Sequence, residues 1–96
     1  MLVLVTYDVT TQDSAGRKRL RKVAKLCQDH GQRVQLSVFE CDLTPAQWAK
    51  LRQRLIDTID ATSDSLRFYF LGARGKEKIE HVGSRTPLDL DGPLIL

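Results

Sequence analysis

Hydrophobic positions follow two periods that alternate along the chain. Residues 2–9 form a continuous apolar, β-branched run, which predicts a strand covered on both faces. The polar residues 10–16 predict a loop. A period of three to four residues then predicts a helix over about residues 17–29, which Gly31 ends. The apolar stripe of this helix consists of Leu20, Val23, Ala24 and Cys27.

A second alternation of strand and helix follows. Residues 33–41 predict one half-buried strand or a pair of short bent strands, with Val34 and Leu36 on the apolar face and Phe39 on the other. Thr44 then predicts a helix start, because Pro45 can occupy the first helical position and Gln47 the capping-box position. This helix runs to about Asp60, and its apolar stripe consists of Trp48, Leu51, Leu55 and Ile59.

The last part of the chain predicts two more strands. Residues 65–71 alternate, with Leu66, Phe68 and Phe70 on one face, and residues 79–82 predict a weaker strand. The tail, residues 86–96, closes on an apolar triplet after a turn signal. The order β-α-β-α-β-β allows both helices to cover one side of a sheet. It predicts an α/β plait in a single domain, residues 1–96.

Composition and length narrow the class of protein. With 42% hydrophobic and 28% charged residues, the 96-residue chain resembles an ordinary globular protein. No apolar run approaches the roughly 18 residues of a membrane span, and the N-terminus lacks the features of a signal peptide. These patterns predict a cytoplasmic protein without a membrane partner. Cys27 and Cys41 form no CxxC pair, which predicts two reduced and mostly buried thiols.

Asp8 is the first candidate for chemistry. It ends the first predicted strand inside an apolar run, where an unpartnered carboxylate is costly to bury. Ligand sites of α/β folds commonly lie at such strand ends. Asp8 therefore fits a metal ligand or a general base, and it also fits a cap that accepts hydrogen bonds from the amides of Thr10 or Thr11.

A cluster of basic residues is the second candidate. Six of the nine residues from 17 to 25 are basic, namely Arg17, Lys18, Arg19, Arg21, Lys22 and Lys25. A solvated helix face is one explanation. The other is a nucleic-acid surface that contacts phosphates without reading sequence, because no acid interrupts the cluster to form i,i+4 pairs. The two histidines, His30 and His81, have no partner at metal-ligand spacing, and no nucleophile–base grouping is present.

Taken together, these patterns resemble the Cas2 family of CRISPR-associated proteins. The matching pieces are the strand end at residues 6–9, the Arg-rich first helix, and the segment RVQLSVFE at residues 33–40. Thr44–Pro45 at the second helix and the strand at residues 64–69 also match. The resemblance covers about residues 1–71, and its most specific part is YDV followed at this distance by RVQLSVFE.

The resemblance implies a fold and partners. The family fold is ferredoxin-like, β-α-β-β-α-β, with residues 33–42 as two short strands and an extra C-terminal strand that packs across a homodimer. Family members pair with Cas1, the CRISPR integrase subunit, to insert new spacers. Many are described as metal-dependent endonucleases on RNA or double-stranded DNA.

The resemblance also assigns site residues. Asp8 matches the metal-binding and catalytic acid, while Arg17 and Arg19 match positions associated with the site. The supporting positions are Tyr7, Arg33, Ser37 and Phe39. One carboxylate per chain is a poor Mg²⁺ site, but a twofold dimer supplies two copies of Asp8. The expected cofactor is therefore one Mg²⁺ or Mn²⁺ per dimer.

Two functions of different class remain open from the sequence. In one, the protein is a metal-dependent phosphodiesterase of CRISPR adaptation. In the other, it is a non-catalytic bridge that holds duplex DNA for the integrase.

Overall fold

The computed structural model describes residues 1–72 and 78–84. They form the strands β1 (Leu2–Asp8), β2 (Gln32–Gln35), β3 (Val38–Asp42), β4 (Ser65–Leu71) and β5 (Lys78–Gly83) and the helices α1 (Ser14–His30) and α2 (Pro45–Thr58). The expected C-terminal strand lies outside the described residues.

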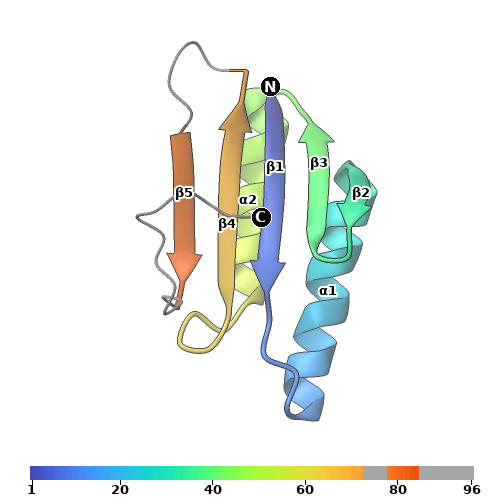
Figure 1. Cartoon of the computed structure of the whole chain (residues 1–96), viewed down its shortest axis with the longest axis vertical. Helices are drawn as coiled ribbons and strands as arrows, with labels where there is room; N and C mark the ends of the chain where they lie inside the picture. Colours follow the sequence, from blue (N-terminus) through green and yellow to red (C-terminus); the bar gives the residue numbers. More distant parts are fainter. Residues whose placement is uncertain (73–77, 85–96) are drawn as a thin grey trace.

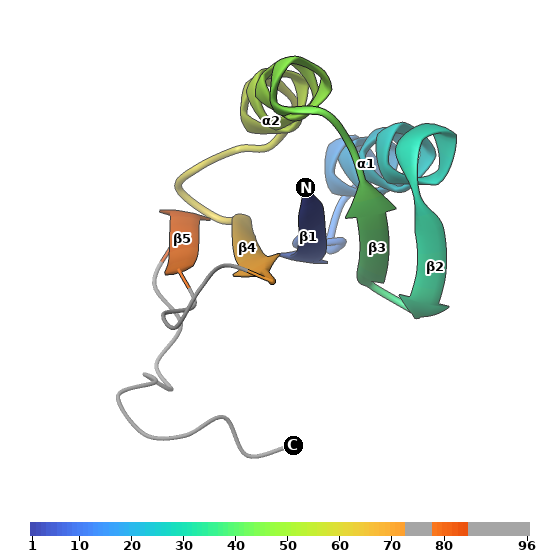
Figure 2. The ribbon, with the colours of Figure 1, turned by 90° about the horizontal axis from the view of Figure 1, so that it is seen from above.

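The sheet has five strands in the order β2-β3-β1-β4-β5, and every neighbouring pair is antiparallel. Both helices lie on the same face of this sheet, with α2 over the central strands and α1 over the β3 side (Figures 1 and 2). The element order from β1 to β4 is β-α-β-β-α-β. The predicted plait is therefore confirmed.

The core fills the space between the helices and the sheet. Alternate residues of β1 point into it, and Val3 and Val5 are fully buried. From α2, the Trp48 ring packs edge-on against Phe68, with ring centroids 4.8 Å apart. Both predicted helical stripes are confirmed, because each supplies buried side chains to this core.

The two cysteines belong to the same core. Cys27 lies on α1 and Cys41 on β3, and both are free and completely buried. Burial raises the pKa of the Cys27 thiol to about 12, and it also raises the pKa of Cys41. The prediction of two reduced, buried thiols is confirmed.

One face of the sheet carries no helix among the described residues (Figure 2). We call it the open face. Leu2, Leu4 and Thr6 of β1 lie on it and are only half-buried. The prediction that β1 is covered on both faces is thus not met within residues 1–72 and 78–84. The apolar run reflects one covered face and one face with leucines that remain partly accessible.

Residues 33–41 form two strands with a turn between them, which corrects the predicted faces. β2 and β3 form a hairpin whose register shifts at Arg33 and Gln35. Because the turn reverses the chain, Phe39 enters the core while Val34 and Leu36 remain 49% and 80% exposed. The sequence analysis placed Val34 and Leu36 on the buried face and Phe39 on the other, because it continued one alternating pattern across the turn.

The first helix begins three residues earlier than its apolar stripe predicts. The carboxylate of Asp13 accepts a hydrogen bond from the Gly16 amide at 2.8 Å, so Asp13 is the N-cap. At the other end, Gly31 has an extended backbone, not the left-handed one expected of a stop. A Cβ there would lie 2.5 Å from Cys41 Sγ and from the Glu40 carbonyl oxygen. Gly31 therefore permits close packing of the helix end on β3.

The second helix begins as predicted. Thr44 accepts a hydrogen bond from the Gln47 amide, and the Gln47 side chain accepts one from the Thr44 amide at 2.9 Å. Within the described residues, no helix is both long and apolar enough to span a membrane.

Candidate metal and nucleic-acid site

Asp8 ends β1 on the open face. Its exposed carboxylate stands across the strand pair from Ser65 of β4 and accepts no hydrogen bond from the described residues. The capping alternative is wrong for Thr10, since the Thr10 amide donates to Asp64 Oδ1 at 2.9 Å. Asp8 therefore presents a carboxylate with free lone pairs at the end of a rigid central strand.

Asp64, which the sequence analysis did not single out, is the buried acid beside this strand end. Besides Thr10, it accepts hydrogen bonds from the Asp60 amide at 2.8 Å and from Arg19 Nε at 2.8 Å. Burial raises the pKa of Asp64, but these hydrogen bonds lower it by more, so it lies below its ordinary value. Asp64 thereby joins the loop after β1, the start of α1 and the start of β4.

Gly83 completes this junction from β5. Its φ of +102° is in the region that favours glycine, and a Cβ there would collide with the Asp64 carbonyl oxygen. The next residue, Ser84, donates its amide to that oxygen at 2.9 Å. The end of β5 is thus held by a hydrogen bond to Asp64, the residue that also binds the loop after β1.

The expected supporting residues lie where the β2–β3 hairpin pairs with the end of β1. The Tyr7 ring stacks on Phe39 at 6.2 Å, and the Arg33 guanidinium lies 5.0 Å from the centre of the Phe39 ring. The Tyr7 amide donates to the Ser37 carbonyl at 3.2 Å. Tyr7 and Phe39 lie on the helix side of the sheet, whereas Asp8 faces the other side. Their contacts therefore hold the strand that carries Asp8.

The basic cluster of α1 divides into paired and accessible residues. Arg19 pairs with Asp64, and Lys25 Nζ pairs with Asp29 at 2.9 Å. The expectation that the cluster lacks i,i+4 partners is wrong at Lys25, because Asp29 lies beyond the run that the pattern covered. Arg17 donates to the Thr11 carbonyl at 3.4 Å and is exposed.

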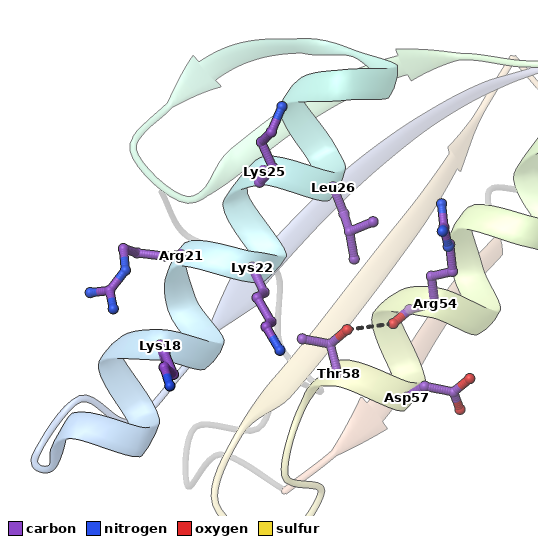
Figure 3. Close-up of a pocket in the computed structure, with 8 residues that line it drawn as sticks. All are labelled: Lys18, Arg21, Lys22, Lys25, Leu26, Arg54, Asp57 and Thr58. Atoms are coloured by element: carbon purple, nitrogen blue, oxygen red, sulfur yellow. Dashed lines mark hydrogen bonds between the residues drawn. The ribbon is translucent and has the colours of Figure 1, made fainter.

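Four basic residues of α1, the paired Lys25 among them, line a groove between α1 and α2, which we call the basic groove. It has a volume of about 670 Å³ and is lined by Lys18, Arg21, Lys22, Lys25, Leu26, Arg54, Asp57 and Thr58. Figure 3 shows Lys22 and Leu26 on the side of α1 toward α2, and Arg21 pointing away from it. Arg54 was missed by the sequence analysis, since only the packing of the helices brings it beside the α1 cluster.

A family comparison decides the relationship of this chain to known proteins. The family model described as CRISPR associated protein Cas2 matches residues 1–79. The chain belongs to the Cas2 family. The resemblance stated from the sequence is thereby confirmed.

Individual Cas2 proteins are similar over almost the whole chain. The CRISPR-associated endoribonuclease Cas2 of Chlorobaculum tepidum is 60% identical over 96 residues, 100% of both chains. The CRISPR-associated endonuclease Cas2 of Halalkalibacterium halodurans is 55% identical over 95 residues, 99% of each chain. A crystal structure of Streptococcus pyogenes Cas2 matches with a TM-score of 0.70 and 62% identity, covering 77% of this chain and 89% of that one.

The described residues of one chain offer few grouped metal ligands. Within residues 1–72 and 78–84, no three His, Cys, Asp or Glu side chains are grouped so that they could hold a metal ion. Both histidines contact backbone carbonyls, His30 that of Leu26 and His81 that of Ser84. An exposed carboxylate with free oxygens nevertheless fits a hard cation such as Mg²⁺, provided that a second carboxylate joins it.

Proposed function

We propose that this Cas2-family chain is a homodimeric, metal-dependent endonuclease of CRISPR adaptation that acts on RNA or double-stranded DNA. One observation carries the proposal: the exposed carboxylate of Asp8 lies at the end of the central strand and accepts no hydrogen bond from a described residue. Relatives named endoribonuclease and endonuclease Cas2 support the reaction class.

The dimer follows from the chemistry of the site and of the open face. A single carboxylate holds Mg²⁺ or Mn²⁺ weakly, whereas a twofold axis beside the end of β1 brings two copies of Asp8 together. The half-buried Leu2 and Leu4 lie on the same face as Asp8. A second copy that covers these leucines would stabilise a small domain and complete the metal site at once.

Residues of the chain fix the position of the Asp8 carboxylate. Tyr7 and Phe39 hold β1 from the helix side, so the Asp8 carboxylate keeps its place at the strand end. When bound, the metal would polarise a phosphoryl oxygen and lower the pKa of a coordinated water. Asp8 would supply a carboxylate oxygen that holds this ion at the end of β1.

We expect one divalent ion to bind per two chains. The reason is that each chain offers one exposed strand-end carboxylate but, within the described residues, no group of three side chains that could hold the ion alone. Calorimetric titration of the metal-free protein with Mn²⁺, together with light scattering for the mass, measures this ratio. A ratio of one ion per chain would exclude the shared site.

The basic groove favours a second candidate function, a bridge that holds duplex DNA for the Cas1 integrase subunit. Five of its lining side chains are cationic and one is acidic. Such a surface suits the phosphate backbone, and it contacts charge without reading bases. The two functions do not exclude each other. The groove lies between the two helices, which cover one face of the sheet (Figure 2), whereas Asp8 lies on the open face.

DNA affinity is expected to depend steeply on salt and little on sequence. Each phosphate contact contributes a slope of roughly −0.9 in log K against log salt. The double variant Lys22→Ala/Arg54→Ala should flatten the slope by about one such unit for each contact that is lost. Lys50→Ala, an exposed cation of α2 outside the groove, is the control and should leave the slope closer to that of the wild type. An unchanged slope in the double variant would exclude the basic groove as the DNA surface.

A further inference from the structure

The backbone is fixed on both sides of Asp8, the candidate metal ligand. Up to Asp8, β1 pairs with β4, and the last pair of the register is Asp8 with Ser65, where both strands meet their loops (Figure 1). Two residues after Asp8, the Thr10 amide donates to Asp64 Oδ1 and the Thr10 hydroxyl donates to the Ser63 carbonyl, both at 2.9 Å. The position of the Asp8 carboxylate therefore depends on the short segment that leads into β4.

Arg19 of α1 holds this segment through Asp64. The Asp64 side chain is completely buried, and its Oδ2 accepts hydrogen bonds from Arg19 Nε and from the Asp60 amide, both at 2.8 Å. A buried carboxylate is costly unless a cation and hydrogen bonds match its charge. Among the described residues, Arg19 is the cation within ion-pair distance of Asp64. The place of Asp64 therefore depends on Arg19.

Arg19 differs from the other basic residues of the α1 cluster. The other five are exposed, whereas the Arg19 side chain is only 22% exposed. Arg19 does not line the basic groove. A phosphate that took Arg19 Nε would leave the buried Asp64 without its counter-ion. These observations favour a role for Arg19 inside the fold.

We propose that Arg19 and Asp64 are positioning residues for the metal site: Arg19 holds Asp64, and Asp64 holds the Thr10 amide and so the end of β1 that carries Asp8. Arg19 thus serves the reaction without contacting nucleic acid, which removes it from the nucleic-acid surface expected from the sequence. The proposal rests on the function proposed above for the role of Asp8. Groups that orient a metal ligand typically change metal affinity by about 10- to 100-fold when they are lost.

The first test is calorimetric titration of the metal-free dimer with Mn²⁺. Arg19→Ala should weaken binding by about 10-fold, the lower end of the range for groups that orient a ligand. Arg19→Lys can still donate to one carboxylate oxygen and should restore part of the loss. The double variant Arg19→Ala/Asp64→Asn should bind no more weakly than Asp64→Asn alone, because Arg19 acts only through Asp64.

Arg52→Ala is the matched control. It breaks the other half-buried arginine–acid pair of the described residues, in which Arg52 Nε donates to Glu80 of β5 at 2.9 Å. This pair joins α2 to β5 and does not contact the end of β1, so Mn²⁺ affinity should stay near that of the wild type. Thermal melting checks that each variant is folded. Unchanged affinity in Arg19→Ala, with normal binding by the wild type, would overturn the positioning role and leave the nuclease proposal intact.

The salt dependence of DNA affinity separates positioning from a phosphate contact. Each lost phosphate contact reduces the slope of log K against log salt by roughly 0.9. Arg19→Ala should keep the slope of the wild type, because Arg19 contacts Asp64 and no phosphate. A slope reduced by about one contact would make Arg19 a nucleic-acid residue and overturn the proposal.

Hydrogen exchange of the Thr10 amide, followed by NMR without metal or nucleic acid, tests the same contacts independently of the nuclease function. In Arg19→Ala it should speed up by about 10-fold relative to the Val5 amide in the middle of β1, because Asp64 loses a hydrogen bond to a charged group. Equal changes at both amides would mean that the pair only stabilises the whole fold, and would overturn its positioning role. If the wild type takes up no Mn²⁺ while Thr10 responds as expected, the nuclease proposal fails, whereas the hold of the pair on the end of β1 is supported.

Discussion

Asp8→Asn is expected to lower metal-dependent cleavage by at least about 100-fold. Changes to residues that merely orient a metal ligand typically cost 10- to 100-fold, so loss of the ligand itself should cost no less. The amide keeps the size of the side chain and removes its charge. Since Asp8 is exposed and makes no hydrogen bond with the described residues, the fold should be unaffected. A cleavage time course on fluorescently labelled RNA and duplex DNA, with Mg²⁺ or Mn²⁺ titrated from zero, measures the effect.

Glu40→Gln is the matched control. Glu40 is an exposed carboxylate on β3, on the same face of the sheet, and stands opposite Leu4. Its removal should leave cleavage close to that of the wild type. If Asp8→Asn retains full activity, the cleavage comes from another protein in the preparation or from other residues. In that case the bridge function would remain the better account of the chain.

The free energy of unfolding should drop by about 3 kcal/mol in Asp64→Ala. Removing one partner of a buried ion pair typically costs 3–5 kcal/mol, and the lower figure applies because the Arg19 side chain is 22% exposed and partly hydrated. The Thr10 and Asp60 amides also lose their acceptor. Urea denaturation followed by circular dichroism, at equal protein concentration, measures the difference. Asp57→Ala, an exposed acid that accepts one hydrogen bond from Gln53, is the control and should cost less than about 0.5 kcal/mol.

The pH dependence of this effect has a definite sign. The pKa of Asp64 is lowered in the folded chain, so its ionised form stabilises the fold fully above the unfolded pKa of about 3.9. This stabilisation is lost as the pH falls through the lower folded pKa. The stability gap between the wild type and Asp64→Asn should therefore be constant near neutral pH and narrow below about pH 4. A gap that stays constant down to pH 2 would mean that the Asp64 charge contributes nothing.

The elements of the fold could be predicted because their signals are local. Thr44, Pro45 and Gln47 are contiguous capping residues, and the stripe from Trp48 to Leu55 keeps one period over the whole helix. The predicted faces of residues 33–41 failed because a tight reversal at Leu36 and Ser37 changes which side an alternating pattern buries. No residue type in that segment marks the turn between β2 and β3.

The site could be predicted only in part, because most of it is made by long-range pairing. Asp8 was identifiable as a lone carboxylate at a strand end. Asp64 was not, since its three main donors, Thr10, Arg19 and Asp60, converge only in the folded chain.

The rate at which the two buried thiols are alkylated measures how often the fold opens. Thiolate, not thiol, reacts with alkylating reagents, and burial keeps Cys27 and Cys41 protonated and out of contact with solvent. Because one thiol belongs to α1 and the other to β3, a reagent reaches them only when the helix separates from the sheet. The rate of alkylation thus counts those separations. The rate can be compared between the free chain and a chain bound to nucleic acid or to another subunit. A lower rate in the complex means that the partner slows the opening of the fold, and the measurement needs no engineered cysteine.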